Sequence, residues 1–279
     1  MDVAAFEHDG FVVVPDVLTP DEVAAARRGL RASIESGSGR SVEEYASNPG
    51  LLLGGRANNP AAAIVAPRWK MRVHMHPRVV EAYTALYSQT FGFGRGIYAH
   101  RFGPVSVPTA LPLIDRVACR FPGEEGLGLH VDKPCDDPDH VRLYWRPIQS
   151  LVCLTDHWSV RDGGLQVVRG SHAALADYLG PDAAPEDGAI KLMGKRHEKM
   201  RGRLETVLAP AGSMILWDAR LLHATTPSLR EGVTREVVYA GFLPNIEPNR
   251  RFSATVQMKR IMDSADRDWE LAEMATGFA

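Results

Sequence analysis

The spacing of hydrophobic residues changes near residue 113. Before that point, apolar residues recur at helical intervals over 20–37 and again over 77–91. Thr19 precedes Pro20, and Glu22 follows three residues after Thr19, which is the pattern of a capping box at a helix start. We therefore expect one helix from Pro20 to a stop near Gly37 and a second helix beginning at Pro77.

Beyond residue 113, short apolar or alternating runs replace the helical spacing, and Gly- and Pro-containing turns separate them. Many short strands at this spacing are typical of an antiparallel sandwich or barrel. The runs cover 114–121, 127–132, 148–155, 164–168, 204–208, 213–218 and 235–243, and a further short strand is expected at 11–15.

The remaining segments have weaker patterns. Residues 38–70 are rich in Gly, Asn and Pro and are predicted to be loop with short pieces of structure, whereas 173–203 is predicted to be a long insertion between strands. The tail over 259–275 has helical spacing. We expect one domain over 1–279: a helical part over about 1–110, a β core over about 111–245, and a C-terminal extension over 246–279.

Composition and charge narrow the partners. A net charge of -2 argues against a protein dedicated to nucleic acid or to a membrane surface. No apolar run is long enough to span a bilayer, and the start of the chain has no secretion signal. Three cysteines without C-x-x-C spacing suit a reducing compartment. We therefore expect a cytoplasmic protein with a small-molecule partner, as a monomer or a homodimer.

His130 and Asp132 stand two positions apart in a strand-like run, so both side chains point to the same face. In isolation, such a pair is best explained as a surface pair or a structural hydrogen bond. A barrel can bring His223, which follows the strand at 213–218, opposite this pair. Two imidazoles and one carboxylate on one side of a metal form the facial triad of non-haem Fe(II) oxygenases.

Arg235 begins the strand 235–243, twelve residues after His223. An arginine there can bind the far end of a dicarboxylate bidentately. The hydroxyl of Thr225 can donate to the same carboxylate, and Gln149 begins a strand that can face the pocket.

The chain resembles the phytanoyl-CoA dioxygenase-like (PhyH) family of Fe(II)/2-oxoglutarate oxygenases. The resemblance rests on FEHDGFVVVPDVLTPDEV at 6–23, HVD at 130–132, LTDHWSVRDGGLQVVRGSH at 154–172 and the pair His223 and Arg235. It implies a mainly β fold with added helices, in which a double-stranded β-helix (jelly-roll, cupin-like) core carries an N-terminal helical layer.

The resemblance also implies a ligand set and a reaction. Fe(II) is expected on His130, Asp132 and His223, and 2-oxoglutarate on Arg235 and Thr225, with Arg230 as the alternative arginine. O2 and the keto acid are expected to oxidise a C–H bond of a small metabolite, most simply by hydroxylation, with succinate and CO2 as co-products. Relatives that halogenate replace the carboxylate of Asp132, which this chain keeps.

Other functions remain open at this point. The same enzyme class performs desaturation, epoxidation and ring formation in biosynthetic pathways. A cupin-like metal isomerase or hydrolase needs no 2-oxoglutarate, and a binding module needs no catalysis. The basic stretch 191–203 is predicted to be either a solvated face or a lid for an anionic substrate. The remaining candidates are predicted to be structural or loop residues: His140, His157, His172 and Cys135.

Overall fold

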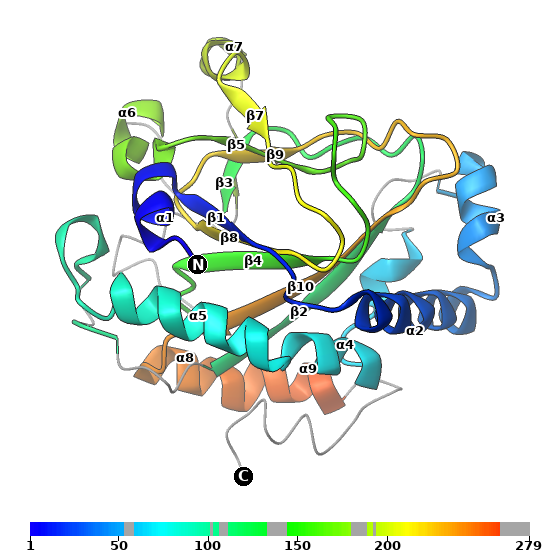
Figure 1. Cartoon of the computed structure of the whole chain (residues 1–279), viewed down its shortest axis with the longest axis horizontal. Coiled ribbons are helices and arrows are strands. Elements are labelled where there is room, and N and C mark those ends of the chain that lie inside the picture. The colour runs from blue at the N-terminus through cyan, green and yellow to red at the C-terminus, as the bar shows by residue number, and fades with distance from the viewer. Residues whose placement is uncertain are drawn as a thin grey trace.

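Two antiparallel five-stranded sheets face each other at the centre of the molecule (Figure 1). The computed structural model describes residues 1–52, 59–100, 103–105, 111–132, 144–179, 189–191 and 194–262. Sheet A has the order β1 (Phe11–Val14), β8 (Met214–Asp218), β4 (Ile148–Cys153), β10 (Arg235–Leu243) and β2 (Leu111–Arg120). Sheet B has the order β6 (Ala189–Lys191), β3 (His130–Asp132), β9 (His223–Thr225), β5 (Leu165–Val168) and β7 (Leu204–Thr206).

Alternation along the strands of sheet A separates two cores. The inward side chains pack against Leu165 and Val167 of sheet B. These inward residues of sheet A are Leu151, Cys153, Ile215, Trp217 and Val237. Their neighbours in the chain point outward, toward the helices: Val152, Met214, Leu216, Val238 and Ala240. This arrangement of two facing sheets is the double-stranded β-helix that the resemblance implied.

Helices cover the outer face of sheet A (Figure 1). Tyr83 donates a hydrogen bond to the Ser150 hydroxyl over 3.0 Å, and Tyr87 donates to the Phe242 carbonyl over 2.9 Å. The α-helices are α1 (Val3–Asp9), α2 (Pro20–Ser38), α3 (Val42–Ser47), α4 (Arg68–His74), α5 (Pro77–Gln89), α6 (Leu175–Leu179), α7 (Gly194–Arg201), α8 (Glu247–Phe252) and α9 (Met258–Met262), and a π-helix spans Ser253–Gln257. Short 3-10 helices span Pro49–Leu52, Pro60–Ala63, Gly96–Tyr98 and Ser171–Ala174.

Strand β10 links the helical layer to the interior. Arg235 faces inward, whereas the next residue, Glu236, faces outward and is fully buried. Arg27 of α2 donates to Glu236 over 2.7 Å, and the Thr234 hydroxyl donates to it over 2.8 Å. The buried carboxylate is therefore neutralised from the helical side, and this interaction fixes the start of β10.

The capping box at Thr19 and Glu22 is confirmed, and β10 has the predicted bounds. The predicted helix stop at Gly37 is wrong, because the helix continues to Ser38 and ends at Gly39, which has the left-handed φ of +70°. The interpretation of 38–70 as loop missed α3, whose own capping box joins Ser41 and Glu44.

One further prediction needs correction, and another is only partly covered by the described residues. The segment 173–203 contains α6 and α7, and it also supplies β6, which pairs with β3 along the predicted metal ligands. In the tail, the described helix α9 ends at Met262, and the rest of the predicted 259–275 helix lies outside the described residues.

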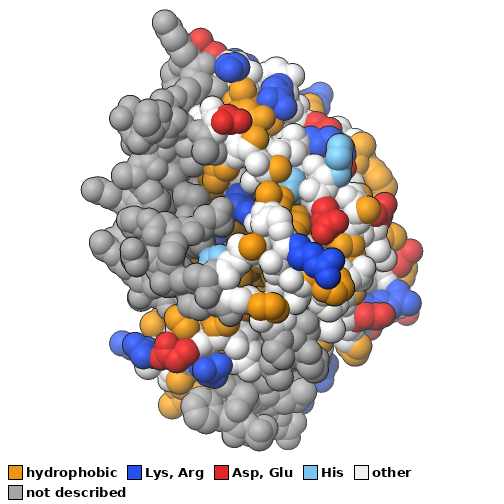
Figure 2. Space-filling model, turned by 90° about the vertical axis from the view of Figure 1, so that its left-hand side faces the viewer, with side chains coloured by type: hydrophobic (Ala, Val, Ile, Leu, Met, Phe, Trp, Pro, Cys, Tyr) orange, Lys and Arg blue, Asp and Glu red, His pale blue; other side chains and the backbone are white. Residues whose placement is uncertain are grey.

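Within the described residues, no helix is both long enough and apolar enough to cross a membrane. On the face in Figure 2, the described lysine, arginine and acidic side chains are interspersed rather than gathered into one block of a single charge. On this face, the described side chains form no basic stripe of the kind that nucleic-acid binding requires.

Candidate metal centre

The three residues proposed as metal ligands lie together on sheet B. His130 and His223 are directly opposite each other on the antiparallel strands β3 and β9, and their ring centroids are 4.2 Å apart. Asp132 lies two residues along β3, on the same face as His130. One potential ligand atom from each residue lies within 4.8 Å of the others.

The distances within this cluster fit a single small cation. Nε2 of His130 lies 3.3 Å from Oδ1 of Asp132, and Nε2 of His223 lies 3.7 Å from Oδ2 of the same carboxylate. Adjacent ligands of a metal with bonds of about 2.1 Å are about 3 Å apart. The two distances to the carboxylate are therefore close to the spacing that one bound ion requires.

Backbone carbonyls orient both imidazoles. Nδ1 of His130 lies 2.7 Å from the Gly128 carbonyl, and Nδ1 of His223 lies 2.9 Å from the Leu221 carbonyl. A carbonyl oxygen can only accept, so each Nδ1 carries a proton, and Nε2 is the ring nitrogen that faces the centre of the cluster. A hydrogen bond from the ring nitrogen that faces away from the metal to a backbone carbonyl is usual for histidines that bind metals.

The carboxylate of Asp132 is held in its charged form. Burial acts to raise its pKa, but the imidazoles of His130 and His223 outweigh burial and hold the pKa of Asp132 well below its ordinary value. A carboxylate must be deprotonated to bind a metal. The local electrostatics therefore prepare Asp132 for a cation.

Two glycines allow close contacts, one with β9 and one with Arg235. The backbone of Gly126 lies so close to β9 that a Cβ there would be 1.9 Å from the Thr225 carbonyl oxygen. Gly163 has a φ of +74°, and a Cβ there would be 3.4 Å from Cδ of Arg235. The chain near Gly163 also bonds to β9, because Thr226 donates to the Gly164 carbonyl over 3.0 Å. Arg235 is thus linked to the strand of His223 through one tight turn.

Arg235 is a buried charge without a hydrogen-bond partner among the described residues. Its side chain is 1% exposed, and none of its three guanidinium nitrogens has a hydrogen-bond partner among the described residues. Leaving a buried guanidinium unpaired costs several kcal/mol in an ordinary core. The geometry is that expected of a binding site for an anion.

Other unpaired donors share this inner face. Gln149 lies opposite Trp217 in the pairing of β4 with β8, and both side chains are buried. Neither Nε2 of Gln149 nor Nε1 of Trp217 has a partner in the described part of the chain. The ring of Trp217 lies 5.7 Å from that of His223. These donors lie on the inner face of sheet A, and Trp217 places one of them close to the metal cluster.

Thr225 and Arg230 have other partners. The Thr225 hydroxyl accepts a hydrogen bond from the Leu127 amide over 2.7 Å, so its oxygen is engaged and its proton is left to donate. Arg230 is half exposed and lies 3.2 Å from Asp162. The structure therefore favours Arg235 over Arg230 as the anion-binding arginine.

Of the four residues predicted to be structural or loop residues, two lie within the described part of the chain. His172 is buried and lies 3.1 Å from the Glu7 carbonyl, which makes it a contact to α1. His157 is fully buried, with Nδ1 3.6 Å from the Cys153 sulfur and Nε2 unpaired among the described residues. The sequence pattern did not predict the burial of His157. Cys135 and His140 lie outside the described residues.

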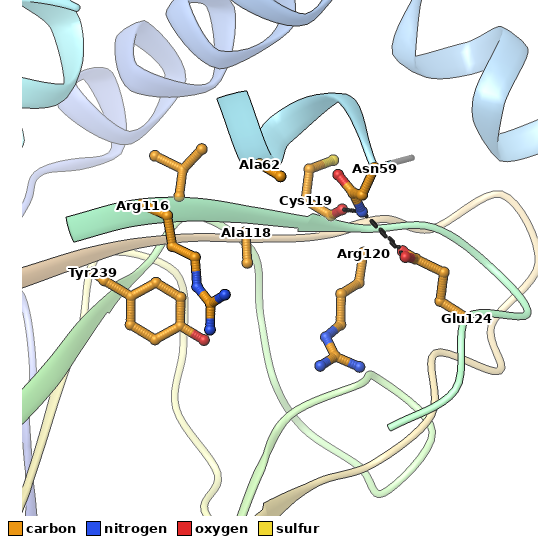
Figure 3. A pocket seen from close by; sticks show the side chains of 9 residues that line it. Asn59, Ala62, Arg116, Ala118, Cys119, Arg120, Glu124 and Tyr239 are labelled. Atoms are coloured by element: carbon orange, nitrogen blue, oxygen red, sulfur yellow. Dashed lines mark hydrogen bonds between the residues drawn. The ribbon is translucent and has the colours of Figure 1, made fainter. Parts of the chain in front are cut away.

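A separate polar pocket lies at strand β2 (Figure 3). Arg116, Arg120 and Tyr239 project to one side of the strand, while Asn59 approaches from the other side and donates to the Cys119 carbonyl over 2.8 Å. Asn59 also donates to Glu124 over 3.1 Å. None of the residues that line this pocket belongs to the metal cluster.

Comparisons with solved structures identify the same fold. The chain is similar to hypothetical protein JW0805 of Escherichia coli, with a TM-score of 0.73 and 14% identity over 99% of this chain and 81% of that one. HygX of Streptomyces hygroscopicus, solved with nickel, 2-oxoglutarate and hygromycin B bound, gives a TM-score of 0.53 and 19% identity over 88% of this chain and 86% of its own.

SnoN, described as an epimerase and solved with Fe3+, alpha ketoglutarate and nogalamycin RO, gives a TM-score of 0.55 and 19% identity over 87% of this chain and 82% of its own. At these identities, the similarity establishes the fold. A comparison with curated proteins found no significant match.

The sequence model of the phytanoyl-CoA dioxygenase (PhyH) family matches residues 121–235. This segment contains all three members of the metal cluster and ends at Arg235. The resemblance of the chain to the phytanoyl-CoA dioxygenase family is therefore confirmed over the segment that carries the candidate site.

Proposed function

We propose that the protein is an Fe(II)- and 2-oxoglutarate-dependent oxygenase that hydroxylates a C–H bond of a small molecule. The observation that carries the proposal is the buried, unpaired guanidinium of Arg235 on the inner face of the same barrel as the cluster of His130, Asp132 and His223. A metal enzyme without a dicarboxylate co-substrate has no use for such an arginine. This argues against a cupin-like isomerase or hydrolase.

Each residue has a distinct part in this proposal. His130, Asp132 and His223 hold the metal on one side and leave its other positions open. Arg235 binds the distal carboxylate of the keto acid, and Gln149 and Trp217 offer further donors close to it. When bound, Fe(II) and 2-oxoglutarate supply the activation of O2, and the keto acid is converted to succinate and CO2 as the substrate is oxidised. The protein orients the reactants and excludes bulk water.

The named relatives support the same chemistry. HygX and SnoN were both solved with a metal, a 2-oxoglutarate molecule and an organic natural product. The retained carboxylate of Asp132 favours oxygen insertion over halogenation. Because SnoN is described as an epimerase, the fate of the substrate radical is the part of the proposal that product analysis must decide.

An anaerobic titration tests the co-substrate directly. Fe(II)-loaded protein should develop the weak visible absorption of a metal–keto acid chelate when 2-oxoglutarate is added, and Asp132→Ala should lose it together with the bound iron. His172→Ala is the matched control, because His172 is a buried histidine that contacts α1 instead. Iron binding without any spectral response to the keto acid would favour the isomerase or hydrolase.

A second measurement separates hydroxylation from the other outcomes. With a turned-over substrate, succinate release should match O2 uptake, and one atom of labelled O2 should enter the organic product. Succinate release with a product that has lost two hydrogens, or has changed only its stereochemistry, would replace hydroxylation by desaturation or epimerisation.

A further inference from the structure

His157 lies on the same buried surface as Arg235. It follows β4 and forms an isolated bridge with Ala209, donating to the Ala209 carbonyl over 2.8 Å and accepting from its amide over 3.0 Å. The ring carbon Cγ lies 3.8 Å from the Cβ position of Gly164, and the preceding Gly163 contacts Arg235. Two consecutive glycines thus bring the imidazole and the guanidinium to one turn.

The two side chains also interact electrostatically. Burial, assisted by the charge of Arg235, lowers the pKa of His157 to about 3, so the imidazole is neutral at physiological pH. The side chain of His157 is completely buried, yet Nε2 has no hydrogen-bond partner in the described part of the structure. A buried, unpaired ring nitrogen lowers the stability of the fold unless a ligand satisfies it.

Cys153 determines whether Nε2 of His157 can donate a hydrogen bond. Burial raises the pKa of the Cys153 thiol to about 12, so the thiol keeps its proton. Its sulfur lies 3.6 Å from Nδ1 of His157. When the thiol donates to Nδ1, the single proton of the neutral imidazole lies on Nε2. His157 then presents a donor on the surface where Arg235 presents three unpaired nitrogens.

We propose that His157 is a second residue that binds the distal carboxylate of the keto acid, with Cys153 holding its tautomer. This inference rests on the proposed function and adds a residue to it. A guanidinium binds the two oxygens of a carboxylate along one edge and leaves lone pairs free on each oxygen. The Nε2 proton of His157 satisfies one of them. Selectivity for a dicarboxylic keto acid over a monocarboxylic one should therefore depend on His157.

Two nearly isosteric substitutions test this role. His157→Gln keeps an amide donor near the position of Nε2, whereas His157→Asn has its amide near Nδ1 and leaves the Nε2 position empty. We expect His157→Asn to raise the dissociation constant of 2-oxoglutarate about 10- to 100-fold, the range of a lost hydrogen bond to a charged group, and His157→Gln to raise it less than about threefold. Binding is measured by calorimetry on Zn(II)-loaded protein without O2, so that turnover plays no part.

A monocarboxylic keto acid identifies which end of the ligand is affected. The affinity for 2-oxobutyrate, which lacks the distal carboxylate, should be the same in the wild type and in both variants. Equal weakening of both keto acids would mean that His157 supports the fold only and would overturn the inference. Unchanged 2-oxoglutarate affinity in His157→Asn would overturn it as well.

The result also separates this inference from the function beneath it. If the wild-type protein binds Zn(II) but no 2-oxoglutarate, the proposed function fails. If the wild type binds 2-oxoglutarate and His157→Asn binds it equally well, only the role of His157 fails. Metal content and the melting temperature of each variant establish that the compared proteins are folded, and His172→Asn is the control for loss of a buried histidine.

Discussion

At the residue scale, the interior of the barrel contains several buried hydrogen-bond donors that have no acceptor among the described residues. Arg235, His157, Gln149 and Trp217 each present at least one such donor, and all four are buried. A protein core normally satisfies its polar groups, so a concentration of unpaired donors lowers stability until an anion binds. The site is therefore expected to reduce the stability of the ligand-free protein in order to bind its ligand.

Arg235→Leu should expose this trade-off. The substitution removes a buried unpaired charge, so the melting temperature of the metal-free protein should rise, because apolar replacement of buried charges stabilises by about 1–4 kcal/mol in favourable cases. Its affinity for 2-oxoglutarate should fall at least 100-fold. Thermal unfolding and calorimetry measure the two effects.

Arg230→Leu is the matched control, because Arg230 is half exposed and already paired with Asp162. It should leave the affinity for 2-oxoglutarate within about twofold. A large loss of affinity in Arg230→Leu, with little loss in Arg235→Leu, would reassign the anion-binding arginine.

At the element scale, the metal cluster depends on how two three-residue strands, β3 and β9, are held together. The segment before β3 forms two hydrogen bonds with Thr225 of β9. The Thr225 amide donates to the Leu127 carbonyl over 2.9 Å, and the Thr225 hydroxyl accepts from the Leu127 amide over 2.7 Å. Gly126 allows this close approach because any Cβ would meet the Thr225 carbonyl. The spacing between His130 and His223 is therefore set by backbone contacts outside the cluster.

Gly126→Ala should disturb the metal site without changing any ligand. The added Cβ would force β3 and β9 apart, so we expect the dissociation constant of the metal to rise at least tenfold, with a loss of stability of about 1–3 kcal/mol. Gly128→Ala is the control in the same loop, because nothing lies within 4 Å of its Cβ position. Competition with a coloured chelator measures both variants. Equal metal affinity in the two would show that this contact does not set the ligand spacing.

Much of the site was predictable at this scale, and the reason is periodicity. The HVD pattern places two ligands on one face of a strand, and Arg235 begins a long apolar strand that the sequence delimits correctly. Strands β6 and β9 are three residues long and were missed, whereas β3 and β7, of the same length, were predicted because they lie within longer apolar or alternating runs. The surroundings of His157 could not be predicted, because its neighbours Ala209 and Gly164 come from other segments whose approach no local pattern encodes.

At the scale of the whole molecule, buried neutral histidines lie in three separate regions. His74 lies under sheet A, His157 lies inside the barrel, and His172 lies against α1. Burial lowers the pKa of His74 and of His157 to about 3, and it also lowers the pKa of His172. In the unfolded chain, each titrates near 6.5.

These histidines should make the protein acid-sensitive. Between pH 6.5 and the lowered pKa values, the unfolded chain binds protons that the folded chain does not, so stability falls as pH falls. We expect the free energy of unfolding to drop by about 2 kcal/mol for each of His74 and His157 between pH 7 and pH 5, and His172 should add to the drop. Urea unfolding at the two pH values measures it.

His74→Gln should remove about 2 kcal/mol of that drop, whereas His8→Gln, at a side chain that is 85% exposed, should leave it unchanged. A free energy of unfolding that is flat from pH 7 to pH 5 would contradict the buried, neutral state of these histidines.

The pairing of β1 with β8 has a consequence for how the protein is made. Residues 11–14 form the edge of sheet A, yet they pair with residues 214–217, which are synthesised only after the whole of 15–213. Until then, the nascent chain presents the apolar run Val12–Val14 without its partner, and such unpaired β-forming segments are prone to join other chains. Helix α2, which carries its own capping box, can form immediately behind this run. Sheet A therefore cannot be completed until β8 has been synthesised. The yield of native protein should depend on how well residues 11–14 are prevented from pairing with other chains before then.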